Sequence, residues 1–269
     1  MSSDPSPAWG PLALSAARAG ITAIELVTSG GDLHTEQKNA SHNLVTAADK
    51  GAEAAIIREI RAARPDDAIL AEETGAQAGT TGVRWLVDPL DGTANFVYGR
   101  RDFAVSVGVE IDHEITAGAV IRSDGQWAAA DRDFFSAGPD LPAAGTAALA
   151  RGLHHETVAS DALIAVGLPY SLSSRRDVLR CLSVIIPGVR GVRIMGSAAA
   201  DLLAVACGQA DAFVGFGLAE WDTAAGQALV APAGGVVTHI EMIGLDVLIA
   251  GPARVVHELS DLLRVAVAA

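Results

Sequence analysis

Two aspartates lie three residues apart in the segment WLVDPLDGTANF, directly after an apolar run. Pro89 fixes its own backbone and favours an extended conformation at Asp88, so Asp88 is expected to end a strand. Gly92 and Thr93 would then open a short helix whose free N–H groups can bind an anion. Asp88 and Asp91 would repel that anion unless a hard cation lay between them, and Mg²⁺ prefers carboxylate, water and phosphate oxygens. The same residue types are also typical of a plain capped turn.

Other carboxylates stand at similar places, and each has an ordinary alternative interpretation. Glu72 and Glu73 end a short apolar strand in LAEETG, where neighbouring side chains point to opposite faces. Asp222 opens a helix in EWDTAAG, where the helix dipole favours a carboxylate. Asp49 in NLVTAADK could be a charged position on the outer face of a helix. Taken together, carboxylates that end strands or start helices are what a two- or three-metal hydrolytic site requires.

The elements that would position these residues follow from hydrophobic periodicity. Helices are expected at 8–27 and 45–64, the second capped by Asn43 or Thr46 and terminated by Pro65. Strands are expected at 68–70, 83–88, 103–111, 114–121 and 126–130. Beyond these, strands at 162–168, 191–196, 211–216, 235–240 and 247–251 alternate with helices at 175–186, 197–208, 221–235 and 252–268. This is a layered α/β plan.

A Gly- and Pro-rich stretch, 136–146, is the best candidate for a boundary between two lobes. We therefore expect an N-terminal α+β lobe over 1–140, carrying most of the metal ligands, and a C-terminal α/β lobe over 141–269, carrying the Trp-Asp motif and substrate contacts.

The overall charge restricts the partners. The 269 residues carry a formal net charge of −13, which repels nucleic acid and anionic membranes. The charge would also repel a phosphorylated substrate unless metal ions reverse it locally. We expect a cytoplasmic protein with neither a signal peptide nor a membrane span.

Three separated motifs, AEETG, DPLDGTANF and WDTAAGQALVAPAGG, occur in the order that resembles the inositol monophosphatase family of Mg²⁺-dependent, lithium-sensitive phosphatases. NLVTAADK and RIMGSAAADLLAVACGQADAF extend the similarity over most of the chain. The resemblance implies an α-β-α-β-α sandwich, a homodimer, and hydrolysis of a small phosphomonoester by direct attack of a metal-activated water.

The resemblance also implies roles for individual residues. Two or three Mg²⁺ ions would be held by Glu72, Asp88, the Leu90 carbonyl, Asp91 and Asp222. Thr93, paired with Asp49 and supported by Glu73, would position and deprotonate the attacking water. The substrate would be contacted by Gly92, Thr93, Asp91, Ala198 and Lys38, of which Lys38 could equally be a surface lysine.

Substrate choice is where the chain departs from the family pattern. Gly215 stands where inositol monophosphatases have a glutamate that hydrogen-bonds the inositol ring, so the pocket is expected to be more open. Glu220 could compensate, or be a loop carboxylate. Arg190 and Arg193 could reach a second anionic group, or lie at a strand edge.

Inositol 1-phosphate is the first expected substrate. Histidinol phosphate, fructose 1,6-bisphosphate and 3′-phosphoadenosine 5′-phosphate are alternatives of the same class. The alternative of a different class is a binding or regulatory family member with little catalysis.

Overall fold

The computed structural model describes residues 8–30, 35–37, 44–132, 134–138, 157–171 and 173–268. Its helices are α1 (Trp9–Gly30), α2 (Ala47–Ala63), α3 (Thr93–Val97), α4 (Arg175–Gly188), α5 (Ala198–Ala206), α6 (Glu220–Val230) and α7 (Ala253–Ala268). The strands of the first half are β1 (Thr35–Gln37), β2 (Leu44–Thr46), β3 (Ala68–Ala71), β4 (Gly75–Gln77), β5 (Val83–Asp91), β6 (Ala104–Ile111), β7 (Glu114–Arg122), β8 (Trp127–Asp131) and β9 (Phe134–Ala137). Those of the second half are β10 (Leu163–Gly167), β11 (Gly191–Arg193), β12 (Ala212–Phe216), β13 (Val236–Met242) and β14 (Leu245–Gly251), and Ala159–Asp161 forms a short 3₁₀ turn.

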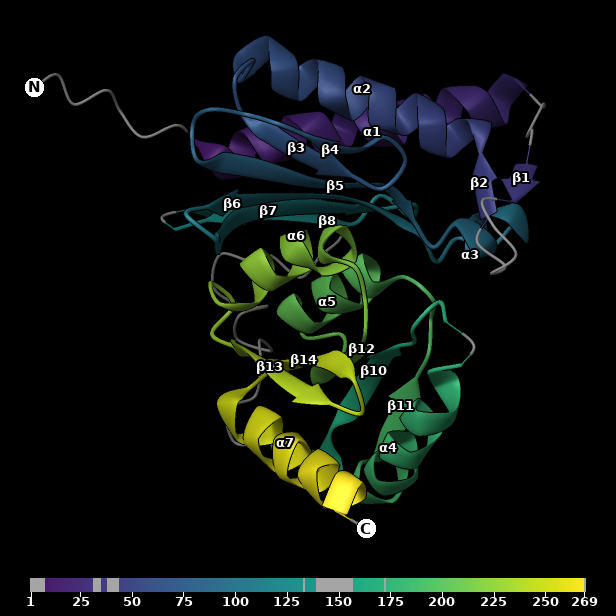
Figure 1. The fold of residues 1–269 in the computed structure, drawn as a ribbon, viewed down its shortest axis with the longest axis vertical. Helices are drawn as coiled ribbons and strands as arrows, with labels where there is room; N and C mark the ends of the chain where they lie inside the picture. The colour runs from purple at the N-terminus through teal and green to yellow at the C-terminus, as the bar shows by residue number, and fades with distance from the viewer. Residues whose placement is uncertain are drawn as a thin grey trace, which may run out of the picture.

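These elements stack in five layers (Figure 1). Helices α1 and α2 cover one face of a seven-stranded sheet, and α5 and α6 lie between that sheet and a five-stranded one. Helices α4 and α7 cover the outer face of the second sheet. The expected α-β-α-β-α sandwich is confirmed.

The first sheet has the strand order β4-β3-β5-β6-β7-β8-β9 and is antiparallel except for the β3–β5 pair. Strand β6 shows why the first sheet needs helices on both of its faces. Val105, Val107 and Val109 join the core under α1 and α2, whereas Ala104 faces the core shared with α5 and α6. The alternation of a strand thus supplies two cores at once.

The second sheet has the order β11-β10-β12-β14-β13. Strands β10, β11 and β12 are parallel, and β14 pairs antiparallel with both β12 and β13. Phe213 packs toward α5 and α6, whereas Val214 and Phe216 pack toward α4 and α7. Parallel strands joined through helices are what the alternating second half of the sequence predicts.

Helix α6 lies very close to the first sheet, and glycines make this approach possible. A Cβ at Gly108 of β6 would lie 2.7 Å from Ala224 Cβ, and one at Gly118 of β7 would lie 2.6 Å from Ala225 Cα. Any larger residue at these strand positions would push α6 away. The glycines therefore set the depth of the helix whose first turn contains Asp222.

Helix α1 is long and apolar enough to pass as a membrane span by length and composition. One face of it, including Ala13, Ala16, Ala17 and Ile24, is buried in the core with α2 and the first sheet. This face accounts for part of its apolar character, and the absence of a membrane span stays a prediction.

Some boundaries differ from the sequence-based expectations. The helix expected from residue 45 begins at Ala47, because Val45 belongs to β2 and Thr46 caps the helix. Helix α6 ends at Val230 and β11 at Arg193, both earlier than expected. Strands β1, β2, β4 and β9 were not expected.

The expected lobe boundary lies mostly outside the described residues. Its first residues, Ser136 and Ala137, belong to β9 and pair with β8. The first sheet therefore extends into the stretch that was expected to be a linker, while residues 139–156 are not described. The division into lobes stays a prediction.

The close packing of α6 gives a test. We expect Gly118→Ala to lower the free energy of unfolding by about 1–3 kcal/mol, because its Cβ meets the helix backbone rather than a movable side chain. Gly51→Ala, inside α2, is the matched control: the nearest neighbour of its Cβ would be Val27 Cγ2 of α1, 3.8 Å away, so the substitution should stabilise by about 0.5–1 kcal/mol. Urea denaturation measures both, and equal effects of the two substitutions would contradict the packing argument.

Candidate active site

Asp88 and Asp91 lie at the irregular end of β5. Asp88 pairs with Ser106 and Asp91 with Ala104, with a shift of register between them. In a regular strand, residues three apart point to opposite faces. Pro89 lacks an N–H and cannot continue the ladder, and Leu90 N donates to Asp88 Oδ1 at 2.9 Å instead. This irregularity lets both aspartates face the start of α6.

Gly92 turns the chain from β5 into α3. Its φ is 98°, and a Cβ there would lie 3.0 Å from the Asp102 carbonyl oxygen and 3.2 Å from that of Gly196. Only glycine meets both conditions without strain. The turn brings Gly92, Thr93 and Ala94 into the lining of a cavity that also contains Asp91 and Asp222.

Thr93 and Asp49 form the pair that the family resemblance implies. The Thr93 hydroxyl lies 3.0 Å from Asp49 Oδ1 and 3.0 Å from the Leu90 carbonyl oxygen, and its single hydrogen can serve one acceptor at a time. Asp49 is fully buried, so it does not lie on an outer helix face. Its Oδ2 accepts from Thr46 N at 2.7 Å and from the Thr46 hydroxyl at 2.6 Å, as part of the capping box of α2.

Glu72 and Glu73 lie in the turn after β3, which Glu53 of α2 holds. The buried Glu53 carboxylate accepts from Glu73 N at 2.8 Å and from Thr74 N at 2.9 Å. Glu72 N donates to the Val87 carbonyl oxygen at 3.1 Å, which ties the turn to β5. Glu72 thereby comes close enough to Asp88 and Asp222 to raise the pKa of both.

The second half of the chain contributes Asp222 and α5. Asp222 N and Oδ2 both bond the backbone of Ala219, and its Oδ1 is buried without a hydrogen-bond partner among the described residues. Asp91 Oδ2 accepts from the Ser197 hydroxyl at 2.8 Å and from Ala199 N at 2.6 Å, at the start of α5. Ala198 lies in the cavity lining beside them.

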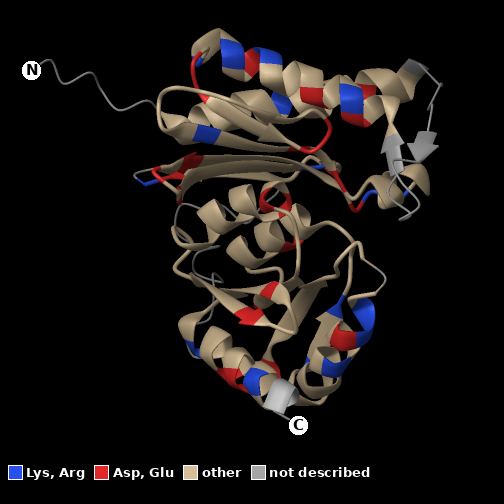
Figure 2. Cartoon of the chain, viewed as in Figure 1, with Lys and Arg blue, Asp and Glu red and all other residues tan. Residues whose placement is uncertain are grey.

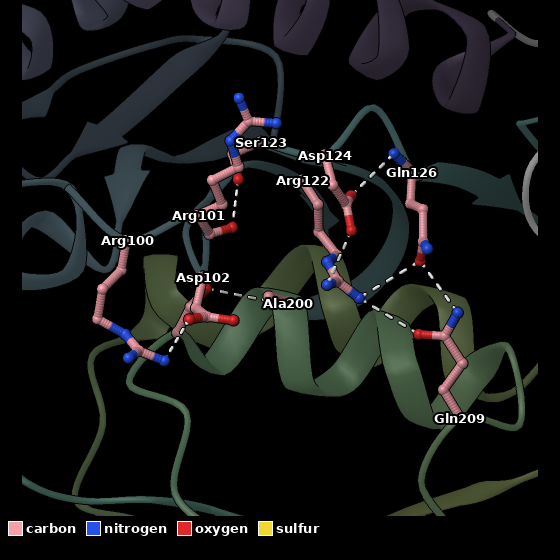
Figure 3. Close-up of polar contacts among 10 residues, drawn as sticks. Arg100, Arg101, Asp102, Arg122, Ser123, Asp124, Gln126, Ala200 and Gln209 are labelled. Carbon is pink, nitrogen blue, oxygen red and sulfur yellow. Dashed lines mark hydrogen bonds and ion pairs between the residues drawn. The ribbon is translucent and has the colours of Figure 1, made fainter.

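The other end of α5 is fixed to the first sheet by a polar cluster (Figure 3). Arg122 pairs with Asp124 at 3.0 Å, and Gln209 just beyond α5 bonds both Arg122 and Gln126. Asp201 is buried in α5, and this burial raises its pKa to about 7, with Arg122 acting in the opposite direction. Helix α5 is thus held at both ends.

Burial and mutual repulsion govern the electrostatics of the site. Asp88, Asp91 and Asp222 are only 1%, 4% and 2% exposed. Burial raises the pKa of all three, and nearby carboxylates raise it further at Asp88 and Asp91. At Asp222, burial and Glu72 raise the pKa to about 7, while the Ala219 N–H and the Asp88 side chain act in the opposite direction. Among the described residues, no arginine or lysine pairs with these carboxyl groups in the way that Arg64 pairs with Asp67.

This donor set fits a hard divalent cation, because repelling carboxylates with an unpartnered oxygen are what Mg²⁺ would satisfy. The described side chains do not, however, form a ready three-ligand group of His, Cys, Asp or Glu. The hydrogen bonds give a reason for this: Asp91 Oδ2 accepts from the Ser197 hydroxyl, and Asp222 Oδ2 accepts from Ala219 N, so both oxygens already have a hydrogen-bond donor. The oxygens would reorient modestly around an ion.

The cavity beside these carboxylates has a volume of about 270 Å³. Its floor contains Asp91, Gly92, Thr93 and Asp222, and its walls contain Leu168, Pro169, Tyr170, Arg175, Ile194 and Leu218. The Tyr170 side chain is 47% exposed, but burial of its hydroxyl beside Asp222 and Asp91 raises its pKa well above the ordinary value. Tyr170 is therefore a neutral hydrogen-bond donor near the site.

Gly215 does not open the pocket, contrary to the expectation. A Cβ at Gly215 would lie 2.7 Å from Leu218 Cδ1 and 2.7 Å from the Phe213 ring. Gly167, the partner of Gly215 across β10 and β12, would collide with the same two side chains. The glycine pair provides room for Leu218, which forms an apolar wall of the cavity.

The other polar candidates for substrate contact lie elsewhere. Glu220 is 59% exposed and bonds Arg84. Arg190 pairs with Asp161 at 3.1 Å, and Arg193 donates to the carbonyl oxygen of Val192. None of the three is in the described lining of the cavity. Lys38 lies outside the described residues.

Sequence reasoning missed several residues at the site. Ser197 follows a glycine and precedes an alanine-rich helix, which is a recognisable cap signal, but its bond to Asp91 spans 106 residues. Glu53 and Arg175 look like ordinary helical charges, and Tyr170 belongs to a loop without a motif. Only the tertiary fold brings these residues to the motifs.

The geometry agrees with what similarity to known proteins shows. A family model described as the inositol monophosphatase family matches residues 11–259. The chain belongs to the inositol monophosphatase family. The inositol-1-monophosphatase SuhB of Mycobacterium tuberculosis is 37% identical over 212 residues, which cover 76% of this chain and 71% of that protein. The Nus factor SuhB of Pseudomonas aeruginosa is 32% identical over 237 residues, 84% of this chain and 83% of that protein.

Solved structures of the family share the fold. The extragenic suppressor protein suhB of Bartonella henselae superposes with a TM-score of 0.79 at 32% identity, covering 96% of this chain and 99% of that one. An inositol monophosphatase from Anabaena superposes with a TM-score of 0.75 at 28% identity, covering 95% and 94%.

The hold of Glu53 on the Glu72 turn gives a second prediction. We expect Glu53→Ala to lower the stability by about 1–3 kcal/mol, because the part-buried N–H groups of Glu73 and Thr74 lose their acceptor, and to reduce activity by displacing Glu72. Glu53→Gln keeps one acceptor oxygen for two N–H donors, so its stability should lie between those of the wild type and Glu53→Ala. Urea denaturation orders the three proteins, and a Glu53→Ala protein as stable as the wild type would contradict the role of Glu53.

The raised pKa values predict a pH dependence of the metal-free protein. Because the folded carboxyls have a pKa above that of the unfolded chain, the folded state binds more protons between about pH 4 and pH 7. In EDTA, the melting temperature should therefore fall as the pH rises from 5 to 8, and added Mg²⁺ should reduce the fall.

Asp222→Asn is the control for this pH dependence. The substitution should make the melting temperature fall less steeply with pH, although Asp201, whose pKa burial also raises, contributes to the same fall. A melting temperature that rises with pH in EDTA, or an unchanged slope in Asp222→Asn, would contradict the assignment.

Proposed function

We propose that the protein is a Mg²⁺-dependent phosphomonoesterase that hydrolyses a small polyol phosphate. The observation that carries the proposal is the burial of Asp88, Asp91 and Asp222 against one another, beside a cavity of about 270 Å³, with no lysine or arginine of the described residues forming an ion pair with them. Family membership supports phosphatase chemistry for this arrangement. Two or three Mg²⁺ ions would be held by Glu72, Asp88, the Leu90 carbonyl, Asp91 and Asp222.

When bound, Mg²⁺ supplies positive charge to the phosphoryl oxygens and lowers the pKa of the attacking water. Thr93 and Asp49 move the proton in this proposal. Because Asp49 Oδ2 is occupied by Thr46, its Oδ1 is the oxygen that accepts the Thr93 hydroxyl hydrogen. The Thr93 oxygen can then accept a hydrogen from the water. Glu73 is retained as a supporting residue.

Substrate binding in this proposal uses the turn at Gly92. The N–H groups of Gly92 and Thr93 would bind the phosphate, and Asp91 and Ala198 would lie against the rest of the substrate, with Lys38 as a further phosphate contact. Inositol 1-phosphate is the first candidate. Histidinol phosphate, fructose 1,6-bisphosphate and 3′-phosphoadenosine 5′-phosphate are the other candidates of the class.

A second candidate function is a regulatory or binding role with little catalysis. It is favoured by relatives named Nus factor SuhB, including one 30% identical over 269 residues from Xylella fastidiosa. The full set of carboxylates in this chain supports catalysis over a purely binding role. For the assembly and location we propose a cytoplasmic homodimer that binds neither nucleic acid nor membrane, in keeping with the charge of −13.

Phosphate release from the four candidate substrates, with Mg²⁺ or with EDTA, tests the proposal. We expect Mg²⁺-dependent release from at least one substrate. Asp88→Asn should abolish it, by about 100-fold or more, because the substitution removes a charged ligand while keeping the shape. Asp112→Asn, in the β6–β7 turn, is an exposed control of the same chemistry and should retain activity.

The outcomes separate the two candidate functions. An Asp88→Asn protein with near-normal activity would reject the metal assignment. No release from any of the four substrates would favour the binding role.

A further inference from the structure

The loop after β10 and the first residue of α4 form one wall of the cavity, and Arg175 is the one cationic residue among their described residues. Leu168, Pro169, Tyr170 and Arg175 all lie in the lining. Among the described lining residues, Arg175 is the one lysine or arginine. The rest of the lining is apolar, neutral or acidic, so Arg175 decides the charge of this wall.

The guanidinium of Arg175 is available to a ligand. Its Nε donates to the Pro169 carbonyl oxygen at 3.4 Å, which draws the side chain back toward the cavity wall. No carboxylate among the described residues forms an ion pair with it. In contrast, Arg180 of the same helix pairs with Asp177 and Arg190 pairs with Asp161. In Figure 2, α4 carries several basic positions together with an acidic one, in a chain whose net charge is −13.

The part of the lining formed by Leu218 offers little to a neutral polyol. Leu218 occupies the space at Gly215 and Gly167, so no side-chain carboxylate can accept ring hydroxyls there. Recognition of the far end of the substrate then depends on Arg175 and on the Tyr170 hydroxyl. A planar guanidinium matches a phosphate group with two parallel hydrogen bonds, whereas it matches a lone hydroxyl poorly.

From this arrangement we infer that Arg175 binds a second anionic group on the substrate, remote from the phosphate that is cleaved. Among the proposed substrates, this would place the bisphosphates above inositol 1-phosphate, the candidate that family membership alone places first. The inference rests on the proposed function. In a protein of charge −13, a second phosphate would be repelled from the cavity without a local cation. Arg175 supplies that cation from a wall distinct from the metal carboxylates.

A matched pair of probes tests the inference: inositol 1-phosphate and inositol 1,4-bisphosphate, which differ by one phosphate. We expect the wild type to have the higher kcat/KM for the bisphosphate. Arg175→Gln should lower the ratio of the two kcat/KM values by about 10- to 100-fold, mainly through the KM for the bisphosphate, since a hydrogen-bonded charge pair is lost. Arg175→Lys should lower this ratio of kcat/KM values less than Arg175→Gln does.

Arg176→Gln is the control, because Arg176 is an exposed neighbour outside the described lining. It should leave the ratio unchanged. Equal effects of Arg175→Gln and Arg176→Gln, or a wild type that prefers the monophosphate, would overturn the inference.

Calorimetric binding of the same two probes, with Ca²⁺ in place of Mg²⁺ to suppress turnover, separates the inference from the proposed function. If no ester is hydrolysed but Arg175→Gln weakens bisphosphate binding selectively, the subsite stands and the phosphatase proposal fails. If esters are hydrolysed but Arg175→Gln changes neither binding nor the ratio, the subsite fails and the phosphatase proposal stands.

Discussion

The architecture depends on keeping like charges together in the interior. Asp88, Asp91 and Asp222 are buried, and each raises the energy of placing a negative charge on its neighbours. Such an arrangement persists only where the surrounding structure fixes it from several directions. Here β5, α5 and α6 each contribute, and separate hydrogen bonds from Leu90, Ser197, Ala199 and Ala219 hold individual carboxylate oxygens.

The layered fold supplies that fixation by bringing distant segments together. The first sheet provides Asp88 and Asp91, and α6, packed tightly on Gly108 and Gly118, provides Asp222. Helix α5 lies between the sheets, with its first turn on Asp91 and its far end joined to Arg122 through Gln209. The site is thus a property of the junction between the two sheets.

Much of the fold could be predicted from the sequence, because local periodicity and motifs carry it. The alternation in β6 and β7 and the helical pattern of α5 gave the right elements, and the order of three motifs gave the family. Short strands such as β4 and β9 were missed, because three or four residues hold too little periodic signal. The pairing of Asp49 with Thr93 agrees with the resemblance.

The parts of the site that could not be predicted from the sequence depend on contacts between residues far apart in the chain. Ser197 reaches Asp91 across 106 residues, and no local pattern encodes such a distance. The interpretation of Gly215 as an opening was wrong because a missing side chain leaves space that a neighbour can fill, and Leu218 does so. The packing of neighbouring side chains decides whether a glycine leaves open space or makes room for another side chain.

The paired glycines of β10 and β12 have a consequence for how the protein can change. Gly167 and Gly215 are partners across β10 and β12 beside Leu218, and none of Asp88, Asp91 and Asp222 is among the nearest atoms to their Cβ positions. A larger residue at either position would push Leu218 into or out of the cavity while β5 and α6 stayed in place. The carboxylates proposed to bind the metal and the residues that shape this wall of the cavity therefore belong to different parts of the fold. Evolution could change which substrates enter the cavity, through Gly167 or Gly215, without changing the proposed catalytic residues.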